Sequence, residues 1–490
     1  MALVFPSPND INRQADDDTA PIVIVGAGPV GIHFVKALLS HKPHIPIMIY
    51  GNEPWLPYHR EQLSSFIAGD IDWSGLVETQ ALPFASNVTS RFNSEIAVID
   101  PVNKQVFEQN GYPQKYQKLI LATGSRPHIP GIAGMALNNV FTFRDLNDAE
   151  RLVARRVRSR RTVVIGGGLL GLEAARAMTR NHTEVVLIEH SNRLMGRQLD
   201  KPASELLREH ILSLGIRVHL SSSVKQICGD TNVSGVLLRN GTHISCDTVI
   251  VATGIKPNME IALAAGIRVG RGIKVNDAMQ TSDPDIYAIG ECAEHNGHVY
   301  DLVTPGYEQA SVAAYNIAGH HSSYSGSVAG AQLKVIGQSV FSMGELDNDA
   351  PDYNLQSLSY EKASAQIYRK LVLSRHRLVG VIAVGNWPEL NRVREAIQQR
   401  RILWPWDIKR FSKSGALWPN AAHVNQWPRK RLVCNCRKVT RKECTRAIAA
   451  GCHTVTEISE HTGAASVCGN CKPLLQQMLN SNSTVKHGYP

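Results

Sequence analysis

The chain has 490 residues, which is too long for a single hydrophobic core and indicates three or four domains. With 43% hydrophobic and 19% charged residues it has the composition of a soluble globular protein, and no apolar run approaches the roughly 18 residues that a membrane span requires. The net charge is +10, and residues 401–490 alone hold 14 Lys and Arg against 4 Asp and Glu, so this basic end indicates an acidic partner, an anionic cluster, nucleic acid or a solvated linker.

The segment 1–20 lacks the basic region and the apolar stretch of a signal peptide, so we expect a cytoplasmic protein. After this tail, PIVIVGAGPVGIHFVKALLSHKPHIPIMIYGNE predicts a strand, a glycine turn, a helix and a second strand. Gly26, Gly28 and Gly31 allow the turn, the approach of backbone to a pyrophosphate, and close helix–strand packing. Glu53 follows the second strand, where a carboxylate can accept hydrogen bonds from a ribose hydroxyl. Tight packing alone is the alternative for one such turn.

A second copy follows in RTVVIGGGLLGLEAARAMTRNHTEVVLIEH, with Gly166, Gly168 and Gly171 in the turn and Glu189 after the second strand. Two complete copies in separate parts of the chain predict two dinucleotide sites instead of two cases of tight packing. A carboxylate at Glu189 binds a free ribose 2′-hydroxyl and repels the 2′-phosphate of NADP, which favours NADH. Arg193, shortly after Glu189, leaves NADPH as the alternative.

Two glycine turns with three further motifs resemble the two-dinucleotide flavoprotein family of pyridine nucleotide reductases. YQKLILATGSRP and CDTVIVATGIKPN resemble the two crossover segments of that family, and DIYAIGECAEHNG resembles its late FAD motif. The resemblance covers positions 21 to about 415 and implies FAD in the first site and NADH in the second. The residues that it adds to the cofactor sites are Ala122, Thr123, Gly124, Gly254, Gly290 and Glu291, while Ala252 and Thr253 complete the second crossover segment.

The first cysteine after the first glycine turn is Cys228, so the redox-active cysteines of disulfide reductases and thiol-based NADH oxidases are missing. NEPWLPYHREQLSSFIAGD, RLMGRQLD and GECAEHNGHVYDLVTPGYEQA resemble the flavoprotein part of NADH-dependent nitrite reductase large subunits and the electron-transfer subunits of assimilatory nitrate reductases. Those proteins carry Ser-Ser, as at Ser64 and Ser65, where ferredoxin and rubredoxin reductases usually have Ser-Lys.

The same resemblance implies roles for three further residues. Arg60 is implied in cofactor binding, and Glu173, on the second glycine helix, is implied near the flavin–nicotinamide junction with an orienting role. Tyr307 is implied near the flavin ring, with an ordinary core aromatic as the alternative. Hydride transfer itself needs no proton-carrying side chain, because the cofactors supply that chemistry.

Beyond residue 320, LKVIGQSVFSMGEL and SAQIYRKLVLSRHRLVGVIAVGN predict antiparallel strands, and PELNRVREAIQQRR predicts a helix. This part resembles the small third domain that covers the flavin in the family. The next stretch, ILWPWDIKRFSKSGALWPNAAHVNQWPRK, is interpreted as a linker held by aromatic anchors, with a partner-binding surface as the alternative. Its four tryptophans are Trp404, Trp406, Trp418 and Trp427.

Six of the nine cysteines lie between positions 434 and 471, although no cysteine precedes Cys228. Cys434 and Cys436 form C-x-C, and Cys468 and Cys471 form C-x-x-C further along the chain. Four thiolates at this spacing suit either zinc or a 2Fe-2S cluster. Two short helices are predicted between the pairs, ending at glycines in a domain small enough to depend on a metal. These glycines are Gly451 and Gly463.

The cysteine pattern resembles the 2Fe-2S domain of bacterioferritin-associated ferredoxin type, which also follows the flavoprotein part of nitrite reductase large subunits. A reductase without a redox thiol needs another electron outlet, which favours the cluster over structural zinc. Cys444 and Cys452 are interpreted as packing residues on the two helices. Arg431 and nearby basic residues either offset the charge of the cluster or attract an acidic partner.

The predicted fold is α/β, with two Rossmann-like domains for FAD and NAD, a small α+β third domain and a small helical 2Fe-2S domain. The predicted function is that of an NADH-dependent oxidoreductase, which passes electrons through FAD and the cluster to a separate nitrate or nitrite reductase. We expect it to bind neither nucleic acid nor a membrane. The chain ends at Pro490, soon after Cys471, so no catalytic sirohaem domain is expected. The rivals are a ferredoxin or rubredoxin reductase serving an oxygenase, and a flavoprotein with a zinc-binding docking module.

The domain boundaries are 1–20 (flexible tail), 21–145 with 247–320 (FAD), 146–246 (NAD), 321–415 (third domain), 416–430 (linker) and 431–490 (cluster).

Overall fold

The computed structural model describes residues 20–77, 86–179, 183–328, 330–335, 338–346, 355–419, 427–434, 439–465 and 471–483. Within these ranges no helix is both long enough and apolar enough to cross a membrane. The chain divides into two compact units. The first unit consists of Met1–Tyr58, Val77–Arg126 and Ile255–Ser327, and the second of His59–Leu76, Pro127–Gly254 and Val328–Pro490.

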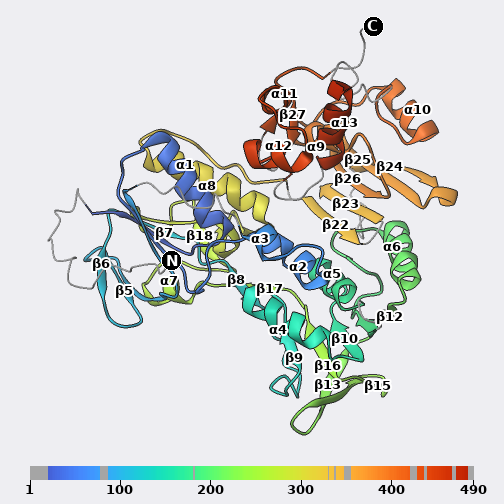
Figure 1. Cartoon of the computed structure of the whole chain (residues 1–490), viewed down its shortest axis with the longest axis horizontal. Helices are drawn as coiled ribbons and strands as arrows, with labels where there is room; N and C mark the ends of the chain where they lie inside the picture. Colours follow the sequence, from blue (N-terminus) through green and yellow to red (C-terminus); the bar gives the residue numbers. More distant parts are fainter. Residues whose placement is uncertain are drawn as a thin grey trace. The chain divides into compact units, whose positions relative to one another are not determined.

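The first unit is built on a parallel sheet in the order β19-β7-β1-β2-β3. Both faces of its central strands are buried, as the uniformly apolar sequences IVIV and IMIY predict. Helix α1 packs against α8 on one face (Figure 1). The elements are β1 (Ile22–Val25), α1 (Pro29–His41), β2 (Ile47–Tyr50), β3 (Val88–Arg91), β4 (Ile96–Asp100), β5 (Gln105–Glu108), β6 (Pro113–Lys115), β7 (Lys118–Leu121), β8 (Ser125–Pro127), β17 (Ile255–Pro257), α7 (Glu260–Ala264), β18 (Ile273–Val275), β19 (Ile286–Ala288), β20 (Ala293–His295), β21 (His298–Val299) and α8 (Val303–Ile317).

The second unit contains a matching parallel sheet in the order β12-β11-β10-β16-β9. The two predicted strand–turn–helix–strand units are therefore confirmed, one in each compact unit. A short helix, α2, packs against α4 and α5. The elements are α2 (Leu63–Ala68), α3 (Trp73–Leu76), β9 (Val140–Thr142), α4 (Leu146–Arg156), β10 (Arg161–Ile165), α5 (Leu169–Met178), β11 (Glu184–Ile188), α6 (Lys201–Ser213), β12 (Arg217–His219), β13 (Val224–Gly229), β14 (Val233–Leu238), β15 (His243–Ser245) and β16 (Thr248–Val251).

An antiparallel sheet in the order β22-β23-β26-β25-β24 follows in the second unit, which confirms the strands expected beyond residue 320. The helix predicted for PELNRVREAIQQRR is confirmed as α9. A further helix, α10, forms where a linker was expected: Pro405 occupies its first turn and the Asp407 side chain accepts from the Trp404 amide, a helix start that the Pro-rich sequence obscured. The elements are β22 (Gly330–Val335), β23 (Gln338–Gly344), β24 (Leu355–Lys362), β25 (Ile367–Ser374), β26 (Arg377–Val384), α9 (Leu390–Gln398) and α10 (Pro405–Ser414).

The last part of the second unit is a strand pair and three helices around a small apolar core. The two helices predicted between the cysteine pairs are confirmed, and Thr440 and Thr454 cap their N-termini. The placement of Cys452 on a helix was wrong, because α11 ends at Ala449 and Cys452 lies in the connection to α12, partly buried against the core. The elements are β27 (Leu432–Cys434), β28 (Val439–Thr440), α11 (Arg441–Ala449), α12 (Val455–Thr462) and α13 (Lys472–Ser483).

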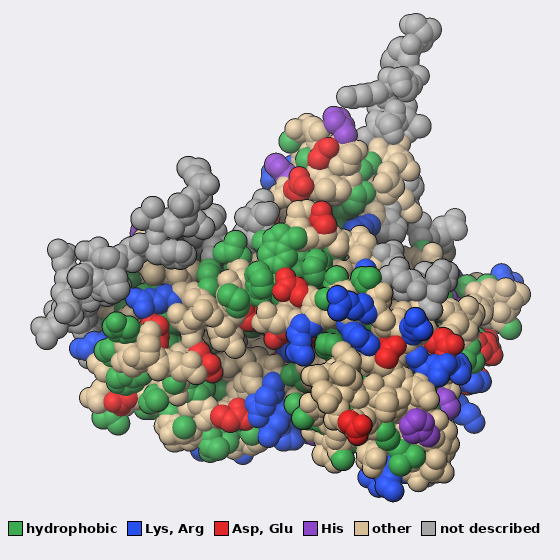
Figure 2. Space-filling model, turned by 60° about the horizontal axis from the view of Figure 1, so that its bottom comes forward, with side chains coloured by type: hydrophobic (Ala, Val, Ile, Leu, Met, Phe, Trp, Pro, Cys, Tyr) green, Lys and Arg blue, Asp and Glu red, His purple; other side chains and the backbone are tan. Residues whose placement is uncertain are grey.

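The surface charge of the described residues is mixed. Figure 2 shows Lys and Arg side chains in several groups on one face, with Asp and Glu side chains beside them and hydrophobic side chains between. Positive and negative side chains are therefore interspersed on this face, and neither sign covers it alone.

Candidate functional site

The first glycine turn joins β1 to α1 in the way its spacing predicts. Gly26 has φ +121°, and a Cβ there would lie 2.1 Å from the Ala122 carbonyl oxygen. A Cβ on Gly31 would lie 2.0 Å from the Gly26 oxygen, so helix and strand pack too closely for any side chain. A Cβ on Gly28 would meet nothing within 4 Å. The turn is therefore closed toward the protein and open at its middle glycine, which leaves room for a pyrophosphate at the N-terminus of α1.

The end of β7 lies beside this turn. Ala122 packs against Gly26, and Thr123 and Asn258 exchange two hydrogen bonds: the Thr123 hydroxyl donates to the Asn258 carbonyl (2.8 Å), and the Asn258 side-chain amide donates to the Thr123 carbonyl (2.9 Å). The Gly124 carbonyl accepts a hydrogen bond from the backbone amide of Asn258 (3.0 Å). The first crossover segment is thus fixed by these hydrogen bonds at the carboxyl end of β7.

The late FAD motif lies in the same unit, after β19. The Glu291 carboxylate accepts from the Ser125 hydroxyl (2.7 Å), and the Gly290 amide donates to the Gln309 side-chain oxygen (2.7 Å). Sequence reasoning missed both Ser125 and Gln309, because each is far from its partner along the chain. The unit therefore brings Glu291 to the strand end that carries residues 122–124.

Tyr307 lies on α8 and is 8% exposed, stacked on the ring of His33 with 4.7 Å between centroids. This position fits the core aromatic interpretation as well as a place near a flavin. Glu53 lies shortly beyond β2, and its carboxylate accepts from the Tyr58 hydroxyl (2.7 Å). Arg60 belongs to the second unit, where its guanidinium donates to the Arg144 carbonyl (3.3 Å).

The one cysteine in the sequence of the first unit, Cys292, is fully buried. Its thiol donates to the carbonyls of Leu121 and Ile289, both at 3.3 Å, and burial raises its pKa. A thiol held protonated in this way is a poor nucleophile. Cys292 is therefore a buried packing residue in the core of the first unit.

The second glycine turn repeats the geometry of the first. A Cβ on Gly166 would lie 2.3 Å from the Ala252 oxygen, and a Cβ on Gly171 would lie 1.9 Å from the Gly166 oxygen. A Cβ on Gly168 would meet nothing within 4 Å. After β16, the Thr253 hydroxyl donates to the His128 carbonyl (2.9 Å), and the Gly254 carbonyl accepts from the His128 amide (2.9 Å). The second turn is therefore also open at its middle glycine.

Glu189 follows β11 directly and is 7% exposed. Its carboxylate accepts from the amides of Gly167 (2.5 Å) and Ser191 (2.8 Å), which fixes it against the second glycine turn. Arg193 donates to the carbonyls of Leu199 (3.2 Å) and Gly196 (3.1 Å) and so holds its own loop. The Glu189 carboxylate is therefore held at the second glycine turn, and the Arg193 guanidinium is held within its own loop.

Glu173 lies in the second turn of α5 in a low-dielectric position. Burial raises the pKa of its carboxyl to about 7, and the Ser64 hydroxyl bond and the Arg176 charge oppose this only in part. Arg176 itself donates to Asp70 (2.8 Å). In the structure, Ser64 therefore supplies a neutral partner to Glu173, and the carboxyl is poised to change protonation near neutral pH.

We expect Glu173 to make stability depend on pH. Because its folded pKa lies above its unfolded value, the neutral carboxyl favours the folded state at low pH, and this contribution is lost as the pH rises through about 7. At about 1.4 kcal/mol for each pKa unit, the loss is at most about 3.5 kcal/mol. Thermal unfolding midpoints measured from about pH 5 to about pH 8 should fall less steeply in Glu173→Gln than in the wild type.

The matched control is Glu205→Gln, because Glu205 is exposed on α6 and paired with Arg208, and its pKa is lowered. This variant should keep the wild-type slope above about pH 6. Parallel curves for Glu173→Gln and the wild type would show that Glu173 does not titrate in this range.

Two of the four predicted metal ligands lie in the apolar core of the C-terminal part. Cys434, at the end of β27, is 3% exposed and Cys471, just before α13, is 2% exposed. Cys436 and Cys468 lie outside the described residues. Cys444, on α11, is fully buried in the same core, and burial raises its pKa to about 12, as a packing residue requires.

Two of the four tryptophans are internal anchors. Trp418 is 4% exposed with the Arg392 guanidinium 4.0 Å above its ring, and Trp427 packs against the C-terminal core with the Arg431 guanidinium 4.1 Å above it. Arg431 also lies 4.0 Å from Glu395 on α9. Arg431 is therefore partly buried at the contact with α9, and the role of the basic residues around the cluster stays a prediction.

Comparisons with known proteins match these parts of the chain. The family model "Pyridine nucleotide-disulphide oxidoreductase" matches residues 20–316, "Rubredoxin NAD+ reductase C-terminal domain" matches 331–401, and "BFD-like [2Fe-2S] binding domain" matches 432–481. The chain therefore has the FAD and NAD(P)H cofactors of this family and a 2Fe-2S cluster.

Two relatives from Bacillus subtilis (strain 168) are similar over nearly the whole chain. A nitrite reductase [NAD(P)H] is 37% identical over 94% of this chain and 57% of its own length, and an assimilatory nitrate reductase electron transfer subunit is 34% identical over 96% and 60%. The chain thus spans less than two thirds of the length of either. A ferredoxin reductase structure from Rhodopseudomonas palustris has a TM-score of 0.72 and 25% identity over 80% of this chain and 99% of its own. The chain belongs to the pyridine nucleotide-disulphide oxidoreductase family, with a 2Fe-2S binding domain after its reductase part.

Proposed function

We propose that this chain is an NADH-dependent electron-transfer oxidoreductase that delivers electrons to a separate nitrate or nitrite reductase. The observation that carries the proposal is one chain with two glycine turns, each open at its middle glycine, and a core that buries two cysteines of a four-cysteine frame. When bound, FAD accepts a hydride from NADH, and the cluster carries single electrons.

The residues divide between the cofactors by the unit in which they lie. The first glycine turn, the end of β7 and the segment after β19 hold FAD, with Glu53 on the ribose. The second turn holds NADH, with Glu189 on the adenosine ribose. The residues of the first set are Gly26, Gly28, Gly31, Glu53, Ala122, Thr123, Gly124, Gly290 and Glu291, and those of the second are Gly166, Gly168, Gly171, Glu189 and Gly254.

Three residues are assigned less directly. Glu173 keeps the orienting role expected from the resemblance, and its raised pKa allows it to hold a proton near neutral pH. Tyr307, on the buried face of α8 in the first unit, is assigned to the FAD site, and Arg60, near the start of α2 in the second unit, is assigned as a further cofactor-binding residue. The proposed iron ligands are Cys434, Cys436, Cys468 and Cys471.

We also propose the domain division expected from the sequence, with the FAD part formed by residues 21–145 and 247–320 and the NAD part by residues 146–246. The two compact units support a discontinuous FAD part, because the first unit resumes at Ile255. The third domain of residues 321–415 then includes α10, and the cluster domain begins at residue 431. A cytoplasmic location accompanies an NADH-dependent enzyme of this kind.

The acceptor is proposed from the names of the relatives, a nitrite reductase and an assimilatory nitrate reductase electron transfer subunit. The second candidate is a reductase of rubredoxin or ferredoxin. It is favoured by an NADH-rubredoxin oxidoreductase from Clostridium acetobutylicum, 31% identical over 92% of its own length. The 2Fe-2S domain supports the nitrate or nitrite reductase as acceptor instead. The match to the NADH-rubredoxin oxidoreductase covers only 74% of this chain, whereas the 2Fe-2S binding domain is a further part at residues 432–481.

The test is anaerobic reduction of the purified chain, followed by visible absorption and by iron and acid-labile sulfide analysis. We expect NADH to bleach both flavin and cluster bands faster than NADPH does, and nitrate reduction to require the catalytic nitrate reductase subunit. Flavin bands without cluster bands would favour the zinc alternative. Faster reduction by NADPH would refute the role of Glu189, and turnover with rubredoxin alone would favour the second candidate.

A further inference from the structure

The turn between β25 and β26 lies beside the segment that joins α9 to α10. Arg375 and His376 form the turn with positive φ, and residues 376–378 run antiparallel to residues 401–403. The Leu378 amide donates to the Arg401 carbonyl, and the Leu403 amide donates to the His376 carbonyl, both at 2.9 Å. These backbone bonds fix two separate segments of the chain side by side.

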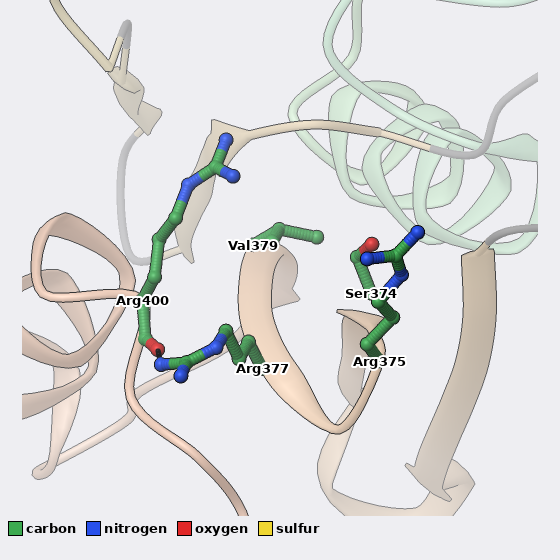
Figure 3. A pocket seen from close by; sticks show the side chains of 5 residues that line it. All are labelled: Ser374, Arg375, Arg377, Val379 and Arg400. Carbon is green, nitrogen blue, oxygen red and sulfur yellow. Dashed lines mark hydrogen bonds between the residues drawn. The ribbon is translucent and has the colours of Figure 1, made fainter.

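A pocket of about 400 Å³ opens at this place, lined by Ser374, Arg375, Arg377, Val379 and Arg400. Figure 3 shows Arg400 on one side of Val379 and Ser374 with Arg375 on the other. The Arg377 guanidinium donates one hydrogen bond to the Arg400 carbonyl (3.0 Å). Because a guanidinium has five N–H donors, its other N–H groups can still bind a ligand. Three arginines and one hydroxyl give this pocket a lining whose chemistry suits anionic groups.

One acidic group among the described residues offsets this charge. The Arg400 guanidinium lies 3.0 Å from the Glu345 carboxylate, and both side chains are exposed, at 66% and 50%. A pair so exposed is weak and exchanges partners easily. Counted over the described residues, the pocket keeps an excess of positive charge.

An exposed aromatic pair follows directly on residues 401–403, the segment that pairs with residues 376–378. Trp404 and Trp406 are stacked with 5.4 Å between ring centroids and an 11° angle, and they are 52% and 60% exposed. Ile402, opposite Arg377 in the antiparallel pairing, is 39% exposed. Two other tryptophans packed on this sheet are buried: Trp387 and Trp418 are each 4% exposed. Exposed tryptophan beside arginine is the composition of the energetic centre of protein interfaces.

We propose that this surface, defined by Arg375, Arg377, Arg400, Ile402, Trp404 and Trp406, docks an acidic segment of the protein that accepts the electrons. This inference rests on the proposed function, because it names the chemistry of the partner. A protein segment is favoured over a free anion, because the aromatic pair and Ile402 offer contact area that only apolar side chains would use. Carboxylates of the partner enter the arginine pocket while its apolar side chains cover the tryptophans.

Two double variants test the two halves of the surface. Arg375→Ala with Arg377→Ala removes charge from an exposed turn, and Trp404→Ser with Trp406→Ser removes the aromatic pair while serine at position 404 still suits the start of α10. With the catalytic nitrate reductase subunit as acceptor, each variant should raise the KM for that subunit about tenfold or more. NADH-driven ferricyanide reduction, which needs no docking, should be unchanged.

The matched control is Arg158→Ala with Arg239→Ala, which removes the same charge from exposed positions elsewhere. This variant should keep the wild-type KM. An equal rise in the control, or no rise in either test variant, would overturn the proposal.

A binding experiment separates this proposal from the proposed function. If no catalytic subunit accepts electrons, binding of poly-L-glutamate is followed by tryptophan fluorescence at low salt. Binding to the wild type that is lost in the arginine variant and weakened in the tryptophan variant supports the surface. The proposal would be overturned if poly-L-glutamate did not bind. It would also be overturned, in favour of nucleic acid, if an oligothymidylate bound more tightly than poly-L-glutamate. It would be overturned in favour of a small anion if inorganic phosphate displaced poly-L-glutamate and the tryptophan variant had no effect on binding.

Discussion

Replacing Cys471 by serine is expected to cut NADH-driven electron delivery to a protein acceptor by on the order of 100-fold or more, because a cluster ligand is lost. NADH-driven ferricyanide reduction should stay near the wild-type rate, since the two glycine turns lie in other parts of the chain. Iron content, sulfide content and the visible cluster bands should fall together.

The expected loss follows from where Cys471 lies. Its side chain is 2% exposed in a core of small volume, together with Cys434, Val433, Ile458 and Leu475. A domain with so small a core depends on its metal centre for stability, so the variant should also unfold this part at lower temperature. The remaining reductase part should melt as before.

Cys444→Ala is the control for the same core. Cys444 is fully buried on α11 and is not a predicted ligand. Its loss should cost on the order of 1 kcal/mol of stability and leave the iron content unchanged. Loss of iron in Cys444→Ala, or a full cluster in Cys471→Ser, would refute the proposed ligand set.

Local patterns explain why so much of the fold followed from the sequence. The glycine turns are short, and their three roles depend on neighbours within one strand–helix unit, so the positions of Gly26, Gly28 and Gly31 were predictable. Alternation likewise predicted the antiparallel sheet beyond residue 320.

Long-range contacts were not predictable in the same way. Ser125 meets Glu291 across 166 positions of the chain, and no spacing rule links them. Ser64 was noted only because a lysine is usual beside it, and its bond to Glu173 emerged from the packing of α2 on α5. Which tryptophans are anchors was also a matter of packing, since Trp404 and Trp418 are identical residue types in one stretch and differ only in burial.

Alanine substitutions at the two middle glycines should separate the two cofactors. Gly28 has φ −72° and Gly168 has φ −82°, values that alanine adopts, and a Cβ at either position meets no protein atom within 4 Å. Each variant should therefore fold. The added methyl would occupy the space that a pyrophosphate needs and weaken its binding by about tenfold or more, or about 1.4 kcal/mol.

The two variants should then differ in which cofactor they lose. Gly28→Ala is expected to purify with little FAD, and Gly168→Ala with full FAD and a raised KM for NADH, as measured by flavin absorbance per protein and by ferricyanide reduction. Gly31→Ala and Gly171→Ala are the contrasting pair, because their Cβ atoms would lie 2.0 and 1.9 Å from backbone oxygens and should disturb folding itself. If Gly28→Ala kept its FAD and lost NADH binding instead, the two sites would be assigned the wrong way round. The test separates folding from cofactor binding, because a methyl group at either middle glycine would contact the bound cofactor and no protein atom within 4 Å.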